Sequence, residues 1–249
     1  MSRTIVVTGG SRGIGAATVR LAAARGWSIG FSYLLNDKAA EETIAAVEAA
    51  GAKALAVKGD VAKEEDVVRL FDATSEAFGP IAGVVNNAGV VIGPPGSLAD
   101  MSTERLMMVI AINILGAMLV AREGVRRMAT DHGGAGGSIV NVSSVAARLG
   151  GANEYVDYAA SKGALDTLTI GLAKECGPLG VRVNAVRPGL IDTEIHARGG
   201  QPGRAERLGV STPLGRAGQA GEVAEAIVWL LSDAASYVNG ALFDVTGGR

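Results

Sequence analysis

Short apolar runs of strand length alternate with helix-length segments from one end of this chain to the other. Seven apolar runs have the length of buried strands, at 5–7, 27–33, 54–58, 81–86, 138–142, 181–187 and 241–245. Helical spacing of apolar residues marks the segments 12–25, 37–50, 63–78, 103–128, 155–176 and 218–231. This alternation predicts right-handed βαβ units, and therefore a parallel sheet with helices on both faces.

Two folds satisfy such alternation, a (β/α)₈ barrel and an open doubly wound sheet. The chain has no eightfold repeat, and a glycine-rich turn follows its first strand, so we favour the open α/β sheet. With 249 residues, of which 48% are hydrophobic, the chain can form one domain over 1–249. The long, glycine-rich segment 190–213 interrupts the pattern, and we predict that it is a mobile lid over the substrate.

Charge and cysteine content exclude several classes of protein. The net charge is −2 with no basic block, which argues against a nucleic-acid partner. The single cysteine, Cys176, cannot form an internal disulfide, and no cluster of His, Cys and Asp has metal-ligand spacing. The first apolar run is too short for a signal peptide, and we find no uninterrupted apolar run near the ~20 residues of a membrane span. We therefore expect a cytoplasmic protein with no metal, no membrane and no nucleic-acid partner.

A glycine-rich turn joins the first strand to the first helix. Its glycines let the backbone approach a pyrophosphate, and the helix N-terminus offers free N–H groups and a positive dipole end. The spacing is G-x-x-x-G-x-G, and its strand–turn–helix context favours nucleotide binding over a plain turn. We expect cofactor contacts from Thr8, Gly9, Ser11, Arg12, Gly13, Ile14 and Gly15.

The end of the second strand should distinguish NADP from NAD. An acidic residue there would bind the ribose 2′-hydroxyl of NAD, but Tyr33 occupies that place. Arg12 can bind a 2′-phosphate through charge-assisted hydrogen bonds, unless it is only a solvated cation at the helix start. We therefore predict NADP(H) as the preferred cofactor, while nearby Asp37 keeps NAD as the alternative.

Polar residues follow several other strands, at the sheet edge where ligands bind in open α/β folds. Asp60 and Val61 end the third strand and would contact an adenine or cap the next helix. Asn86-Asn87-Ala88-Gly89 ends the fourth strand, where the amides would brace the loops or touch the cofactor. Ser143 and Ser144 end the fifth strand, where a hydroxyl can bind a substrate carbonyl.

Tyr158 and Lys162 are four residues apart on a predicted helix, and therefore share one face. A nearby ammonium favours the phenolate, which would let the tyrosine exchange a proton with a substrate oxygen near neutral pH. Asn113 lies inside an apolar helix, where a buried amide needs partners, so it is either a structural brace or part of a polar relay.

Taken together, these residues resemble the short-chain dehydrogenase/reductase family over essentially the whole chain. The glycine turn resembles the family's cofactor motif, residues 86–89 its N-N-A-G motif, and residues 158–162 its Y-x-x-x-K motif. The resemblance implies a Rossmann fold and a catalytic tetrad formed by Asn113, Ser144, Tyr158 and Lys162. It also implies that Pro188, Gly189, Ile191 and Thr193 bind the cofactor from the loop over the nicotinamide. The other cofactor-binding residues that it implies are Tyr33, Asn87, Ala88, Gly89, Tyr158 and Lys162, and Lys162 would bind the nicotinamide ribose hydroxyls.

The resemblance further implies reversible hydride transfer to a carbonyl and assembly into a homotetramer or homodimer. The bacterial glucose-dehydrogenase-like and 3-oxoacyl-carrier-protein-reductase-like groups are the most similar. The gap between serine and tyrosine is one residue longer than in many members, so Ser143 remains a rival to Ser144. A protein that senses NADP without turnover, and an isomerase or dehydratase on the same fold, are the competing hypotheses. The substrate itself cannot be inferred from the sequence.

Overall fold

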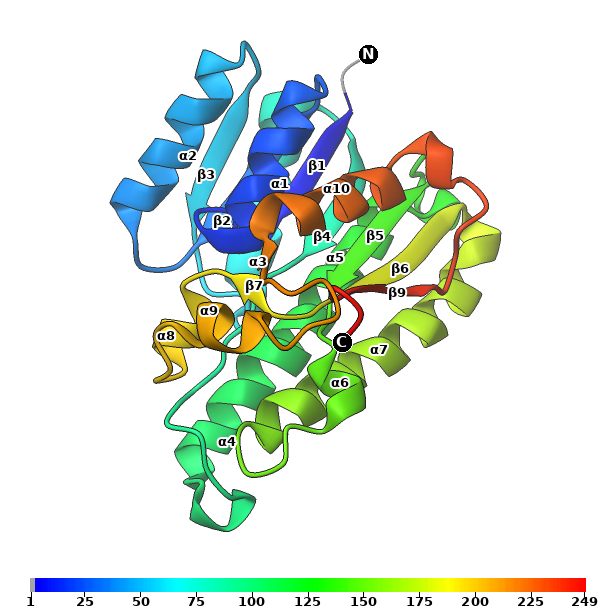
Figure 1. The fold of residues 1–249 in the computed structure, drawn as a ribbon. Coiled ribbons are helices and arrows are strands. Elements are labelled where there is room, and N and C mark those ends of the chain that lie inside the picture. Colours follow the sequence, from blue (N-terminus) through cyan, green and yellow to red (C-terminus); the bar gives the residue numbers. More distant parts are fainter. Residues whose placement is uncertain (1–2) are drawn as a thin grey trace.

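A seven-stranded, entirely parallel sheet forms the centre of the molecule (Figure 1). The structure is a computed structural model that describes residues 3–249. The strands are β1 (Thr4–Val7), β2 (Ser28–Tyr33), β3 (Ala54–Lys58), β4 (Ile81–Asn86), β5 (Gly137–Val142), β6 (Val181–Pro188) and β9 (Leu242–Val245). Their order, β3-β2-β1-β4-β5-β6-β9, confirms the predicted doubly wound Rossmann sheet.

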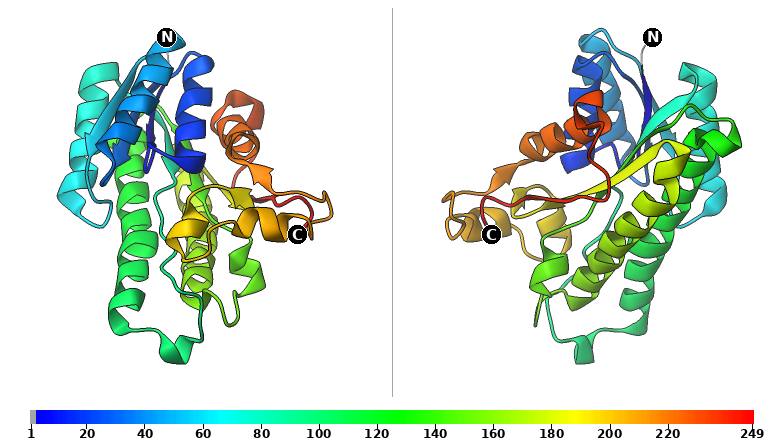
Figure 2. Two further views of the ribbon diagram at one scale, coloured as in Figure 1. Left: turned by 60° about the vertical axis from the view of Figure 1, so that its left-hand side comes forward. Right: turned by 90° about the vertical axis from the view of Figure 1, so that its right-hand side faces the viewer.

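Helices cover both faces of this sheet (Figure 2). One face packs against α1 (Gly13–Ala24), α2 (Asp37–Ala49) and α10 (Ala220–Leu231). The other face packs against α3 (Glu64–Phe78), α5 (Ala117–Met128) and α7 (Val156–Cys176). Strand β1 shows the cause, since the fully buried Ile5 and Val7 face the first helix layer and Val6 faces the second.

The order of the strands reverses at β1 and β4, which are adjacent in the sheet but far apart in sequence. The chain leaves β1 toward one side of the sheet and β4 toward the other, so their carboxyl ends open a crevice between the two connections. This crevice is where the glycine turn after β1 and the polar residues after β4 meet. The topology therefore gathers residues that the sequence separates by about 80 positions.

The predicted helix 103–128 is one continuous helical stretch with a change of winding in its middle. It consists of α4 (Thr103–Val109), the π-helical segment η2 (Ile110–Gly116) and α5. It is long and apolar enough to cross a membrane by length and composition, although the polar Asn113 interrupts its apolar run. One face packs into the protein, and core helices of soluble proteins pass the same test, so the expected absence of a membrane stays a prediction.

The segment 190–213, here called the lid segment, is more regular than predicted. It contains the strand β7 (Ile191–Asp192) and the short helices α8 (Ile195–Arg198) and α9 (Arg204–Gly209). Strand β7 pairs with β8 (Gly218–Gln219) in a small parallel sheet. The remaining short helices are α6 (Ala146–Leu149), η1 (Leu98–Asp100), η3 (Thr130–His132), η4 (Gly177–Leu179) and η5 (Asp233–Ala235). Figure 1 shows α8 and α9 beyond the carboxyl ends of β1 and β4.

Candidate active site

The glycine turn brings its backbone close to the start of α1. Gly9 and Gly13 have φ angles of +66° and +54°, which favour glycine. A Cβ atom on Gly15 would lie 2.2 Å from the carbonyl oxygen of Gly9, so only glycine fits there. The turn leaves the first N–H groups of α1 facing an open groove, which is an arrangement that suits a pyrophosphate.

The end of β4 braces this turn. Thr8 Oγ1 accepts hydrogen bonds from the backbone N–H groups of Asn87 (3.0 Å) and Ala88 (2.9 Å). Asn87 Nδ2 donates to the carbonyl oxygens of Thr8 (2.8 Å) and Gly9 (3.2 Å). Asn86 lies deeper, where its Nδ2 donates to Ala117 O (2.8 Å) and Asn141 Oδ1 (3.2 Å). The two asparagines therefore hold the glycine turn and the sheet edge together.

A groove runs from this turn along the carboxyl ends of β1, β2 and β3. Tyr33, Asp60 and Val61 line it with the glycine turn, as the sequence predicts for a cofactor site. Asp60 also caps the following turn, because its Oδ1 accepts from Ala62 N–H at 3.0 Å. The position of Asp60 is therefore compatible both with contact to an adenine and with a capping role.

The carboxylate that kept NAD open as an alternative is engaged by its neighbours. Asp37 accepts hydrogen bonds from Lys58 Nζ (3.0 Å) and from the Tyr33 hydroxyl (3.0 Å). The contact with Lys58 lowers the pKa of Asp37 below its usual value. Asp37 is thus an exposed carboxylate that is already hydrogen-bonded to two neighbours, and it is not among the residues that line the groove with Tyr33.

Tyr158 and Ser144 lie together in a second cavity at the ends of β5 and β6. Ser144 Oγ accepts from Ala146 N–H at 3.1 Å, and its hydroxyl is near enough to Tyr158 to act on the pKa of that side chain. Ser143 points elsewhere, because its buried Oγ donates to the carbonyl oxygen of Lys162 at 3.2 Å. The geometry therefore favours Ser144 over Ser143 as the hydroxyl that faces a substrate.

Lys162 and Asn113 stand behind Tyr158. Lys162 Nζ donates to Val142 O at 2.7 Å and lies 5.6 Å from the centre of the Tyr158 ring. Asn113 Nδ2 donates to Val90 O (2.9 Å) and Ser161 Oγ (3.0 Å), and its Oδ1 accepts from Val90 N–H (2.8 Å). Asn113 lies in the π-helical segment η2, and such segments often occur at functional sites. The buried amide thus braces the loop after β4 beside Lys162.

Burial moves the pKa values of Tyr158 and Lys162 in opposite directions. The pKa of Tyr158 is raised to about 12 because the protein withdraws the phenol from water, although the hydrogen bond to Ser144 acts the other way. The pKa of Lys162 is lowered to about 8 because burial disfavours its ammonium, against the opposing charge of Asp166. In the chain alone the pKa of Tyr158 is therefore raised and not lowered as the nearby ammonium led us to expect, because burial of the phenol is the dominant effect.

The second cavity has both apolar and charged side chains in its lining. Val91, Val145, Leu149 and Leu190 are among the apolar ones, and Glu154, Arg204 and Arg249 are among the charged ones. Arg204 donates to both oxygens of Glu154, at 3.1 and 2.6 Å. These contacts tie the lid segment to the loop that precedes α7.

Tyr155 fastens the lid segment at a second point. Its buried hydroxyl donates to Gly199 O at 2.7 Å, and its ring lies under the Arg204 guanidinium at 5.6 Å. Tyr155 therefore packs against the lid segment and lines the cavity.

The two cavities meet at residues that line both of them: Ile14, Asn87, Gly89, Thr193 and Ile195. Every predicted site residue lies at one of these walls, except that Thr8, Gly15 and Asn113 lie directly behind them. Sequence reasoning missed Glu194 and Arg198, which also line the groove beside the glycine turn and have no local motif. Among residues 3–249, no group of three His, Cys, Asp or Glu side chains is arranged to hold a metal ion.

Comparison with known proteins gives consistent similarities. A family model described as enoyl-(acyl carrier protein) reductase matches residues 9–249. The uncharacterized oxidoreductase YgfF of Escherichia coli is 51% identical over 244 residues, covering 98% of each chain. The 3beta-hydroxysteroid dehydrogenase 1 of Eggerthella lenta is 41% identical, covering 99% of this chain and 93% of the other. The solved structure of a Serratia marcescens short-chain dehydrogenase/reductase variant superposes with a TM-score of 0.90 at 33% identity, covering 99% and 97% of the two chains.

Proposed function

This chain belongs to the short-chain dehydrogenase/reductase family and is an oxidoreductase for alcohol or carbonyl substrates, and from that premise we propose NADP(H)-dependent hydride transfer. The substrate would be a small molecule that carries a carbonyl or a secondary alcohol. The observation that carries the proposal is the position of Tyr158 and Ser144 in a cavity that opens directly into the cofactor groove.

The cofactor groove fits a dinucleotide. Gly9 and Gly13 hold backbone conformations that favour glycine, and the place of a Gly15 side chain is taken by the backbone. The N-terminus of α1 and Arg12 supply positive charge for phosphates. When bound, NADPH would supply the hydride for the carbonyl carbon.

The protein's own residues would handle the proton and the substrate oxygen. Ser144 would donate a hydrogen bond to the substrate oxygen and stabilise the charge that forms on it. Tyr158 would pass its hydroxyl proton to that oxygen during reduction and take it back during oxidation. A tyrosine pKa of about 12 keeps this proton in place at neutral pH, which is the form that reduction needs.

Lys162 would bind the nicotinamide ribose hydroxyls. Asn113 would hold a water molecule that links Lys162 to solvent. Both side chains flank Gly89, since a Cβ on that residue would lie 3.5 Å from Lys162 Nζ and 3.4 Å from Asn113 Oδ1. The buried lysine is in place to receive a hydroxyl, provided that it exchanges its hydrogen bond to Val142.

The affinity for NADPH is expected to fall as pH rises above about 8, the pKa of Lys162. The ammonium form binds the cofactor, so its loss weakens binding by up to about tenfold per pH unit until the pKa of the complex is reached. Fluorescence titration measures the dissociation constant of NADPH at pH values from about 6.5 to about 9.5, a range that extends to both sides of this pKa. The variant Lys162→Met should show no such inflection, and the same inflection in both proteins would contradict the role of Lys162.

The reaction is tested by NADPH oxidation against diketones, ketoacyl thioesters, sugars and steroids, repeated with NADH. Steroids belong in this panel because the Eggerthella relative is named a hydroxysteroid dehydrogenase. Turnover that is faster with NADPH than with NADH supports the proposal. Cofactor binding without turnover of any carbonyl or alcohol would favour a sensor or scaffold, and product without a change in NADPH would favour an isomerase or dehydratase.

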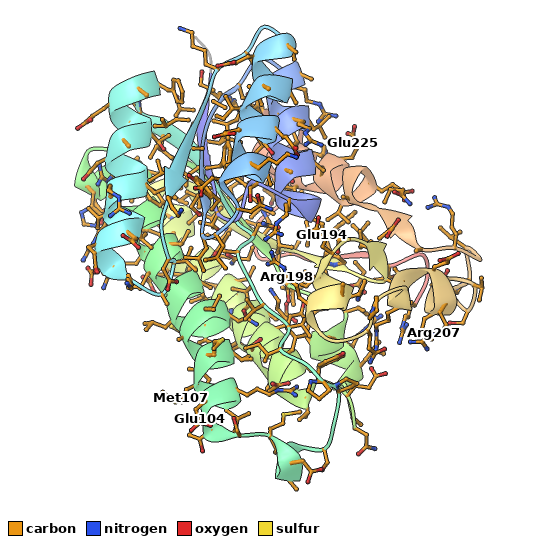
Figure 3. The ribbon with its side chains drawn as sticks, turned by 90° about the vertical axis from the view of Figure 1, so that its left-hand side faces the viewer. Glu104, Met107, Glu194, Arg198, Arg207 and Glu225 are labelled. Atoms are coloured by element: carbon orange, nitrogen blue, oxygen red, sulfur yellow. The ribbon has the colours of Figure 1, made fainter. Side chains whose placement is uncertain are left out.

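We also propose a homotetramer that works in the cytoplasm. The stretch from α4 to α5 exposes large apolar side chains that an assembly would cover: Met107, Met108, Ile110, Leu115 and Met118. Figure 3 shows Met107 at the outer surface of α4. Exposed large apolar side chains along one helical stretch are typical of an interaction surface.

A further inference from the structure

One ion pair crosses the entrance of the cofactor groove. Arg12 Nη1 lies 3.0 Å from Glu194 Oε2, and both side chains line the groove. Arg12 belongs to the glycine turn and Glu194 to the lid segment, 182 residues later. The guanidinium proposed for the cofactor's 2′-phosphate is therefore already paired with a carboxylate.

The lid segment holds a second partner for this carboxylate. Arg198 follows Glu194 by four residues, and its backbone N–H donates to Glu194 O at 3.2 Å, so the two side chains are one helical turn apart. Arg198 is exposed and also lines the groove. Figure 3 shows Glu194 and Arg198 on the side of the lid segment that is turned toward α1.

We propose that Glu194 is a specificity-determining residue for the adenosine end of the cofactor. Its carboxylate and the 2′-phosphate of NADP compete for Arg12, whereas NAD carries no group at that position. When the phosphate takes Arg12, Glu194 turns to Arg198 and the charges of the groove remain paired. This inference rests on the proposed function, and it goes beyond that function by assigning a lid residue to cofactor choice.

Glu194 consequently lowers the affinity for NADP relative to the affinity for NAD. NADP must displace a carboxylate and accept a negative neighbour, while NAD leaves the Arg12–Glu194 pair in place. The Arg12 side chain is 29% exposed and that of Glu194 is 65% exposed, so solvent screens their charges. The displacement of the carboxylate and its repulsion of the phosphate are each expected to change the affinity for NADP only a few-fold. Because the exchange separates Arg12 from Glu194, the binding of NADP also breaks this contact between the glycine turn and the lid segment.

The test compares the dissociation constants of NADPH and NADH in the wild type and in Glu194→Gln, by fluorescence titration at one salt concentration. We expect Glu194→Gln to bind NADPH about five- to tenfold more tightly, with NADH unchanged within about twofold. The control Glu206→Gln removes the same charge from an exposed position of α9 and should change neither constant.

A double variant separates a direct exchange from a general charge effect. In the background of Arg12→Ala, Glu194→Gln should no longer change the ratio of the two constants, because the shared partner is gone. The inference is overturned if Glu194→Gln leaves NADPH affinity unchanged, improves both cofactors equally, or acts the same without Arg12. If the wild type binds neither dinucleotide, the proposed function fails first, so the two failures are distinguishable.

Discussion

The variant Tyr158→Phe is expected to lower kcat by about 10³-fold and to leave the dissociation constant of NADPH within about twofold. Phenylalanine keeps the ring that packs beside Lys162 and Ser144, but it has no proton to give to the substrate oxygen. The cavity wall and the cofactor groove stay as they are. Only the chemical step loses a component, so the change should appear in kcat.

Steady-state assays and cofactor titration on the same preparation separate these two effects. Tyr237→Phe is the matched control, because Tyr237 is fully exposed and removal of its hydroxyl should leave kcat unchanged. Activity of Tyr158→Phe near the wild-type level would refute the proposed mechanism. A large loss of NADPH affinity in this variant would instead assign Tyr158 to cofactor binding.

The variant Gly15→Ala is expected to weaken NADPH binding at least about tenfold and to lower the free energy of unfolding by about 1–3 kcal/mol. Its Cβ would lie 2.2 Å from Gly9 O and 2.6 Å from Asn87 Nδ2. Both atoms belong to the hydrogen-bond network that shapes the glycine turn, and neither can move without breaking it. One methyl group therefore affects the stability and the cofactor site together.

Urea unfolding and cofactor titration measure the two consequences of Gly15→Ala. Gly221→Ala provides the comparison, because a Cβ on that exposed helical glycine meets no atom within 4 Å. We expect Gly221→Ala to bind NADPH like the wild type and to unfold at the same or a slightly higher denaturant concentration. If Gly15→Ala behaves like Gly221→Ala, the tight turn is not needed for cofactor binding.

The sheet and its helices could be predicted because their signals are local. A strand buried on both faces is a short apolar run, and a helix repeats its apolar residues every three or four positions. The predicted strand 54–58 matches β3 at both ends, and 81–86 matches β4. The lid segment lacked either signal, and its two helices, of four and six residues, are held by contacts with distant residues.

The glycine turn and the Tyr158–Lys162 pair could also be predicted, because the backbone itself sets their spacing. The electrostatics of that pair could not. Charge proximity alone predicts a lowered tyrosine pKa, whereas burial raises it to about 12 and lowers that of Lys162 to about 8. Burial depends on the surrounding walls, which come from β5, β6 and the lid segment.

The sequence by itself determined the parallel α/β fold and the glycine turn between its first strand and first helix, since each depends on residues close together in the chain. Only the tertiary structure distinguished Ser144 from Ser143, placed Asn113 in a π-helical segment, and paired Arg12 with Glu194. These outcomes depend on where a side chain points and on what lies across the groove. Contacts over 182 residues leave no periodicity or spacing in the sequence, because the fold alone brings their partners together.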